Sequence, residues 1–339
     1  MPAFPKKWLI VLLVLAVGIP LLRPVLPDVV SDYRLFLVST MMIAAIAVLG
    51  LNLLTGFNGQ ISLGHGAFYA VGAYTAAVLM DQAGMPYWAT LPCAAVVCFI
   101  VGYLFGLPAL KLEGHYLALA TFALALAVPQ ILKYKWLEGL TGGVQGIVLS
   151  KPEAPFGLPL SEDQWLYYYI LVVMVVLYWA ANNILNSRSG RAMMAIRDQY
   201  MAADTMGIDT ALYKTVTFGI SAMYTGIGGA LSAFAVGHIA PDSFTFFLSI
   251  SFIIGVTVGG NASIAGPFIG ALFIQFVPNF ADEISKAAPW AIYGVTLIAV
   301  VYLMPDGVIG AADRRLAAIV AWWNRRRGVR PVAPPGPRA

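Results

Sequence analysis

Long apolar stretches separated by short polar segments make up most of this chain of 339 residues. Ten of the stretches approach the roughly 20 residues that an α-helix needs to cross the hydrocarbon core of a bilayer. They lie near residues 8–26, 35–54, 64–80, 87–108, 115–132, 165–184, 214–236, 245–259, 264–280 and 288–304. The pattern predicts an all-α polytopic membrane protein with about ten transmembrane helices. The third, eighth and ninth stretches are short, so these three are the candidates for re-entrant helices.

The first stretch follows Lys6 and Lys7, as the apolar part of a secretory signal peptide would. No small-x-small cleavage site comes after it, because the run ends in Leu21-Leu22-Arg23-Pro24. We therefore expect a retained first transmembrane helix.

A polar segment, Asn52 to Ala77, interrupts the apolar pattern with Gly, Asn, Gln, Ser and a His. Backbone that leaves a helix inside a membrane must be buried in protein or line a watery cavity. The segment therefore predicts a broken or re-entrant helix beside a pathway, either as part of an inner gate or as a substrate site. The candidate translocation-path residues are Asn58, Gln60, Ser62, Gly64, His65 and Gly66. His65 is open to a second interpretation, in which it caps or packs the helix break.

Composition and charge agree with a membrane protein. Hydrophobic residues make up 60% of the chain and charged residues 11%, against about 25% charged in soluble domains. The net charge of +4 does not indicate nucleic-acid binding, because the basic residues lie at the ends of apolar stretches. With both termini in the cytoplasm, fourteen Lys and Arg residues fall inside and six outside. This bias predicts that both termini are cytoplasmic.

Two long loops and a tail complete the expected organisation. The transmembrane domain spans residues 1–310, and its outer loop 133–163 has room for one short helix or turn. A cytoplasmic segment covers residues 187–213, which we call the coupling segment. The basic tail 311–339 is rich in Arg, Pro and Gly and is expected to be disordered.

The coupling segment carries the second strong pattern. Good helix formers between Gly190 and Gly207 predict one amphipathic helix of about four turns. Its expected apolar face consists of Ala192, Ala195, Ile196, Ala203 and Met206. Such a helix suits docking into a groove on a partner protein, and the alternative is an interfacial helix lying on lipid.

Several kinds of chemistry are not supported. His65, His115 and His238 are far apart and form no metal-ligand spacing, and Cys93 and Cys98 are expected to be buried and unpaired. The dipeptide Gly-Lys never occurs, so the chain has no ATP-binding P-loop. The apolar stretches hold almost no carboxylates, which argues against a stand-alone ion-coupled carrier or channel. An integral membrane enzyme would need a catalytic cluster that the sequence lacks.

Small residues recur at helical spacing in the seventh and eighth stretches. The pairs are Gly226 with Ala230, Gly229 with Ala233, and Gly255 with Gly259. Small-xxx-small pairs let helix backbones approach closely, so these stretches are predicted to pack tightly.

Six motifs occur in order along the chain. They are GFNGQISLGHGAFYAVGAY at 56–74, KLEGHYLALATF at 111–122, TGGVQG at 141–146, SGRAMMAIRDQYMAADTMGI at 189–208, GGNASIAGPFIGA at 259–271 and PDGVIG at 305–310. Together they resemble the permease subunits of branched-chain amino acid ABC transporters, on the LivM-like side of the LivH/LivM family.

The resemblance implies a permease subunit in the bacterial inner membrane. It also implies two cytoplasmic ATPase subunits that bind ATP and Mg²⁺, a second LivH-like permease and a periplasmic binding protein. This chain itself would bind no cofactor or metal. Within the family, the cargo could instead be urea, a short amide or an aromatic acid.

The resemblance also assigns the site that couples the permease to the ATPases. The matching residues are Arg188, Gly190, Arg191, Ala195, Arg197, Asp198, Ala202, Ala203, Met206 and Gly207. The related EAAxxxG pattern has Met201 in its Glu position, which weakens any ion pair expected with the ATPase there. A second departure is Gln130, near which relatives often have an acidic residue, and this leaves the cargo open.

Overall fold

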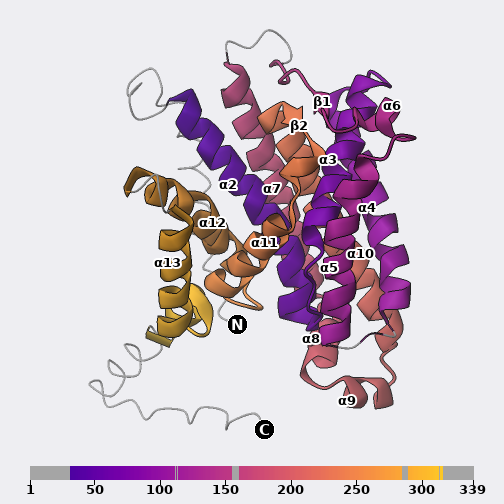
Figure 1. Cartoon of the computed structure of the whole chain (residues 1–339). Helices are drawn as coiled ribbons and strands as arrows, with labels where there is room; N and C mark the ends of the chain where they lie inside the picture. Colours follow the sequence, from indigo (N-terminus) through magenta and orange to yellow (C-terminus); the bar gives the residue numbers. More distant parts are fainter. Residues whose placement is uncertain are drawn as a thin grey trace.

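A computed structural model describes residues 31–110, 112, 114–154, 160–284, 289–312 and 314–315. The expected first helix at 8–26, Lys111 and most of the basic tail lie outside these residues. The described part contains nine long helices (Figure 1). They are α2 (Asp32–Asn52), α3 (His65–Asp81), α4 (Tyr87–Ala109), α5 (His115–Leu132), α7 (Glu162–Asn186), α10 (Thr210–Val236), α11 (Phe246–Gly259), α12 (Gly266–Ile284) and α13 (Pro289–Leu303).

Each apolar stretch from 35–54 onward is a helix, as the hydrophobic pattern predicts. By length and composition, seven helical segments of the described residues could cross a membrane, and Gly266–Ala281 is a shorter apolar helix. The polytopic helical fold is thereby confirmed. The total of about ten helices and the cytoplasmic position of both termini stay predictions.

Helix α10 lies at the centre of the bundle, where it packs against α2, α3 and α4. The small residues of α10 allow this close contact. A Cβ added at Gly229 would overlap the carbonyl oxygen of Tyr69 in α3, and one added at Gly226 would overlap Sγ of Cys98 in α4. The predicted tight packing of this helix is confirmed, because neither position has room for a side chain.

The polar segment breaks the helix as expected. Helix α2 continues into one π-helical stretch, η2 (Leu53–Phe57), and α3 begins only at His65. Between them, Asn58, Gln60, Ser62 and Gly64 are buried by this chain, whereas Gly59 and Ile61 are exposed. The π-helix is a local widening of the backbone that often marks functional positions.

Helices α11, α12 and α13 form a flank beside this bundle. Helix α12 packs against α2 and α11, and α13 packs against α12 and α11 (Figure 1). Helix α2 makes the most extensive contact with this flank, and α11 also contacts α3 and α5.

One end of the molecule carries short elements that cross-link two loops. The outer loop contains α6 (Glu138–Thr141), the short helix that its length allows. The strands β1 (Ile147–Val148) and β2 (His238–Ile239) pair antiparallel, with Ile147 opposite Ile239. The sequence did not predict this small ribbon, because a two-residue pairing between distant loops leaves no hydrophobic pattern.

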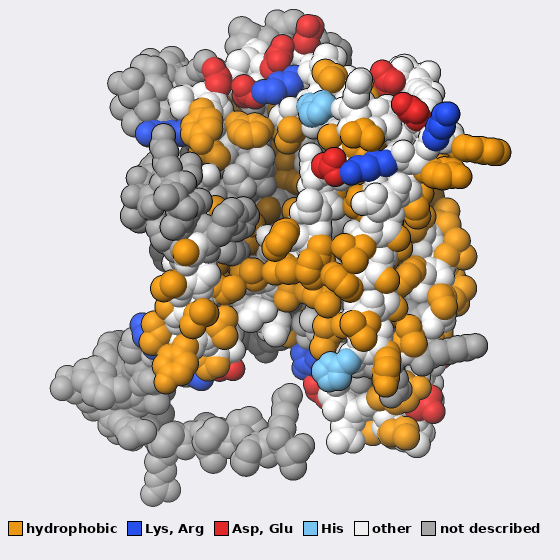
Figure 2. Space-filling model, in the orientation of Figure 1, with side chains coloured by type: hydrophobic (Ala, Val, Ile, Leu, Met, Phe, Trp, Pro, Cys, Tyr) orange, Lys and Arg blue, Asp and Glu red, His pale blue; other side chains and the backbone are white. Residues whose placement is uncertain are grey.

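The charged side chains in Figure 2 gather toward the two ends of the visible face, and hydrophobic side chains form the belt between them. The coupling segment lies at the end opposite the ribbon (Figure 1). It follows α7, whose start is fixed by a capping box between Ser161 and Gln164.

Candidate coupling site and translocation path

The coupling segment forms two helices, α8 (Arg188–Asp198) and α9 (Tyr200–Thr205). The prediction of one helix from Gly190 to Gly207 is wrong, because Gln199 is extended, with φ −154° and ψ 96°. An unbroken helix of that length would measure about 27 Å. The break folds the chain instead, so that α9 contacts both α8 and α10.

The break also changes which side chains are buried. Ala192, Ile196 and Ala203 of the expected apolar face are buried, but Met206 is 82% exposed. Met201 is 76% exposed as well, and Tyr200 is 40% exposed. Helix α9 therefore presents apolar side chains to the outside at this end of the molecule.

Arg197 joins the coupling segment to the polar segment. Its Nη1 donates to the carbonyl oxygen of Gly56 in η2 at 2.9 Å. Its Nε and Nη2 donate to Oδ1 of Asp198 at 3.0 and 2.8 Å, which holds the guanidinium plane in place. This contact brings two sequence-predicted segments together that are 141 positions apart.

The other predicted coupling residues take different positions. Gly190 lies against the backbone of Leu185, where a Cβ would overlap the carbonyl oxygen. Gly207 ends α9 with φ +81°, and its N–H and that of Ile208 donate to the carbonyls of Asp204 and Ala203. Arg188, Arg191 and Ala202 are exposed, and Ala195 is half-buried.

His65 lies inside a chain of hydrogen bonds that links three helices. Ser221 Oγ donates to the carbonyl oxygen of Gly50 in α2 at 2.6 Å. It therefore accepts from His65 Nε2, also at 2.6 Å, which leaves Nδ1 to accept from Ser62 Oγ at 2.9 Å. Both ring nitrogens of His65 are occupied within the protein, and its side chain is 1% exposed. The arrangement agrees with the capping and packing interpretation.

The remaining path candidates are also buried. Gln60 Nε2 donates to the carbonyl oxygen of Lys214 at 3.1 Å. Gly66 N–H donates to Ser249 Oγ at 2.9 Å, and a Cβ at Gly64 would lie 2.6 Å from the carbonyl oxygen of Thr121. Asn58 differs, because neither atom of its buried side-chain amide has a hydrogen-bond partner among the described residues.

Three residues of this region were missed by sequence reasoning, namely Asn52, Gly56 and Ser221. Asn52 is fully buried and bonds to residues more than 200 positions away. An amide at the end of an apolar stretch was a signal that could have singled it out, since a polar side chain there must find a partner.

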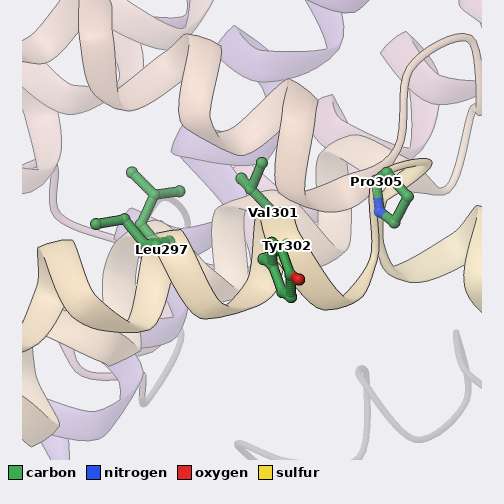
Figure 3. Close-up of a pocket in the computed structure, with 5 residues that line it drawn as sticks. Leu297, Val301, Tyr302 and Pro305 are labelled. Atoms are coloured by element: carbon green, nitrogen blue, oxygen red, sulfur yellow. The ribbon is translucent and has the colours of Figure 1, made fainter.

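A pocket on α13 does not add to this site. Figure 3 shows Leu297, Val301 and Tyr302 lining it, together with Pro305 after the helix. The lining is almost wholly apolar and lacks groups that would orient a polar substrate. Such a surface suits contact with lipid chains.

The bundle of apolar helices and its apolar belt define the broad class, a multi-pass membrane protein. The chain belongs to the family of branched-chain amino acid transport system permease components, whose model matches residues 33–304.

Several curated proteins are similar to this chain. The high-affinity branched-chain amino acid transport system permease protein LivM of Escherichia coli K12 is 31% identical over 90% of this chain and 75% of its own length. The corresponding LivH permease of the same organism is 22% identical over 79% of this chain and 92% of its own. The autoinducer 2 import system permease protein LsrC of Salmonella paratyphi B is 22% identical over 73% and 70% of the two chains. No solved structure gives a significant match.

Membership in this family decides the broad function. The chain is a permease subunit of an ABC importer in the inner membrane, and it is not an enzyme. The resemblance drawn from the six motifs is confirmed.

Proposed function

We propose that this chain is the translocating subunit of an ATP-driven importer of branched-chain or related hydrophobic amino acids. A periplasmic binding protein delivers the substrate, and two cytoplasmic ATPase subunits supply the energy. A second, LivH-like permease completes the membrane core. The similarity to LivM over 90% of the chain is the observation that carries the proposal.

The coupling segment supports a docking role for α8 and α9. Tyr200, Met201 and Met206 are exposed on or directly after α9, at the end of the molecule away from the ribbon. A small apolar surface beside arginines fits a groove on a folded partner. Arg197 of α8 is hydrogen-bonded to η2, so a displacement of α8 by a docked partner would also displace η2 in the bundle.

The outer end supports docking of the binding protein. The ribbon ties the loop 133–163 to the loop after α10, and Lys133 and Asp242 add an ion pair between the same regions. The two loops thereby form one surface. A third loop, 282–289, is a further candidate for this surface, and its residues 285–288 lie outside the described part of the chain.

The amino acid itself is expected to be selected by the binding protein. Many of the polar side chains described in the bundle are hydrogen-bonded within the protein, as in the chain from Ser62 to the carbonyl oxygen of Gly50. Alternating access would then carry the substrate between the permeases as the ATPases close.

The test is uptake by the complex of this chain with two ATPases, a LivH-like permease and a binding protein in liposomes. We expect ATP-dependent uptake of leucine, isoleucine or valine, and the same assay with urea, short amides and aromatic acids tests the alternative cargoes. Uptake by this chain alone under an ion gradient would overturn the proposal in favour of a secondary carrier.

A pair of matched variants tests docking separately. Met206→Asp places a charge directly after α9, on the proposed docking surface, and should reduce co-purification of the ATPase subunits about tenfold. Val148→Asp introduces the same carboxylate in place of another exposed apolar residue. Val148 is 75% exposed on the β1–β2 ribbon, so co-purification should stay unchanged. Equal retention of the ATPases by both variants would exclude α9 from the docking surface.

A further inference from the structure

Segments from four of the six motifs meet at one place, and one of them is α8 of the coupling segment. They are η2, α8, the turn 260–265 between α11 and α12, and the residues that follow α13. We call the place where they meet the junction, and its defining residues are Asn52, Gly56, Arg197, Ala262 and Gly307. These residues come from distant parts of the sequence, and hydrogen bonds and close backbone packing hold them together.

Asn52 holds the α11–α12 turn against the end of α2. Its Nδ2 donates to the carbonyl oxygen of Ser263 at 2.8 Å, and its Oδ1 accepts from the N–H of Ala262 at 3.1 Å. The side-chain amide thus pairs with the backbone of the turn through both of its ends. Asn52 is 0% exposed, so water does not replace these partners.

The turn that Asn52 holds is locally strained. Ala262 has φ +57°, and within the described residues it is the non-glycine residue with a positive φ. A side chain disfavours this left-handed conformation, so it persists where surrounding contacts impose it. The two hydrogen bonds to Asn52 are such contacts.

The neighbouring backbone is packed without spare room. A Cβ at Gly56 would overlap Oδ1 of Asn52 and lie 2.6 Å from the N of Ala262. A Cβ at Gly307 would lie 2.5 Å from Cα of Gly260, so the segment after α13 rests on the same turn. Movement of any one of these segments would displace the others.

Helix α8 is joined to the other segments of the junction by two contacts. Arg197 donates to the carbonyl oxygen of Gly56, one turn of chain beyond Asn52. Met193 of α8 shares a hydrophobic cluster with Leu53 and Phe57 of η2, and Ala262 and Ile264 of the turn pack against that cluster. A displacement of α8 is therefore passed to η2 by a polar and an apolar contact.

We propose that Asn52 is a positioning residue that transmits movement of the coupling segment to α11, α12 and α13. The step rests on the proposed function, since it requires that ATPases act on α8. Through the amide of Asn52, a shift of η2 moves the α11–α12 turn and changes the position of the flank against the central bundle. Asn58 lies just beyond η2, and its buried amide has no hydrogen-bond partner among the described residues, which fits a segment that exchanges partners during the cycle.

The first test uses the reconstituted complex with the substitution Asn52→Leu. This change keeps the approximate volume and removes both hydrogen bonds to the turn. We expect the substrate transported per ATP hydrolysed to fall about three- to tenfold, while the ATPases still co-purify and hydrolyse ATP. A purely structural role would lower the amount of complex without changing this ratio.

The matched control is Thr225→Val. Thr225 is also 0% exposed, and its Oγ1 donates to carbonyl oxygens of Ser221 and of Ala47 in α2, at 3.0 and 3.5 Å. It therefore links α10 to α2 away from the junction, and its transport ratio should equal that of the wild type. An unchanged ratio in Asn52→Leu, or an equal fall in both variants, would overturn the proposal.

A second measurement needs no variant and tests the proposed role of Asn52 even if the Asn52→Leu complex does not assemble. Hydrogen–deuterium exchange of peptides covering 255–265 is compared in the wild-type complex with and without trapped ATP. We expect exchange in the α11–α12 turn to change with that of 50–60. Equal exchange of 255–265 in both states refutes the role of Asn52, whereas loss of ATPase association or of ATP-driven uptake in the wild type refutes the proposed function itself.

Discussion

At the scale of single residues, Arg197 shows how the coupling segment is attached to the bundle. Its guanidinium reaches Gly56 with one nitrogen and Asp198 with two others. A hydrogen bond from a charged group contributes about 1.5–3 kcal/mol. Lysine could not reproduce the geometry, because its ammonium is a point charge without a planar fork.

We expect Arg197→Met to lower ATP-driven uptake by about tenfold, which corresponds to about 1.4 kcal/mol. Methionine keeps the apolar stem, so α8 should still pack and the protein should still insert. Uptake by the reconstituted complex at saturating binding protein is the measurement. Arg315→Met is the control, because it makes the same Arg-to-Met change at an exposed residue after α13, outside the coupling segment. Similar uptake by the two variants would remove Arg197 from the coupling route.

His65 illustrates what a sequence leaves undecided about one residue. A histidine in a glycine-rich break between apolar stretches suits a path residue and a helix cap equally well. The decision depends on Ser221, which is 156 positions away and accepts from Nε2. Only the folded chain brings these two side chains together, so no local pattern could have assigned the role.

At the scale of helices, the contact between α3 and α10 tests how much the bundle depends on small residues. Gly229→Ala places a Cβ on the carbonyl oxygen of Tyr69, and backbone cannot move aside as a flexible side chain can. Overpacking of this kind costs about 1–3 kcal/mol. We expect a lower midpoint of thermal unfolding for the purified protein in detergent.

The matched control for this change is Gly294→Ala in α13, where an added Cβ meets nothing within 4 Å. Alanine stabilises a helix by about 1 kcal/mol relative to glycine, so this variant should unfold at the same temperature or higher. An unchanged midpoint in Gly229→Ala would mean that the two helices can separate without loss of stability.

The helices were largely predictable, and their exceptions have physical reasons. Long apolar runs specify membrane helices because the backbone must satisfy its own hydrogen bonds in lipid. The break at Gln199 has no such signal in the sequence, since no Gly or Pro marks it, and in the folded chain α9 lies against both α8 and α10. The amide bonds of Asn52 and the β1–β2 ribbon likewise depend on distant partners.

At the scale of the whole molecule, the two ends differ in structure. One end joins its loops through the ribbon and the Lys133–Asp242 ion pair, and the other carries α8, α9 and the junction. The distribution of Lys and Arg predicts that the second end faces the cytoplasm, where positive charge is retained during insertion. The proposed roles of both ends depend on this orientation.

Labelling of single introduced cysteines tests the orientation directly. Val148→Cys lies on the exposed outer ribbon and should react with a membrane-impermeant maleimide in spheroplasts. Ser189→Cys lies at an exposed position of α8 and should react only after the membrane is permeabilised. The wild-type chain is the control, because Cys98 is buried and Cys93 lies half-buried within α4. The reverse pattern would place the coupling segment outside the cell, where no ATPase could act on it, and would contradict the charge argument and the proposed coupling together.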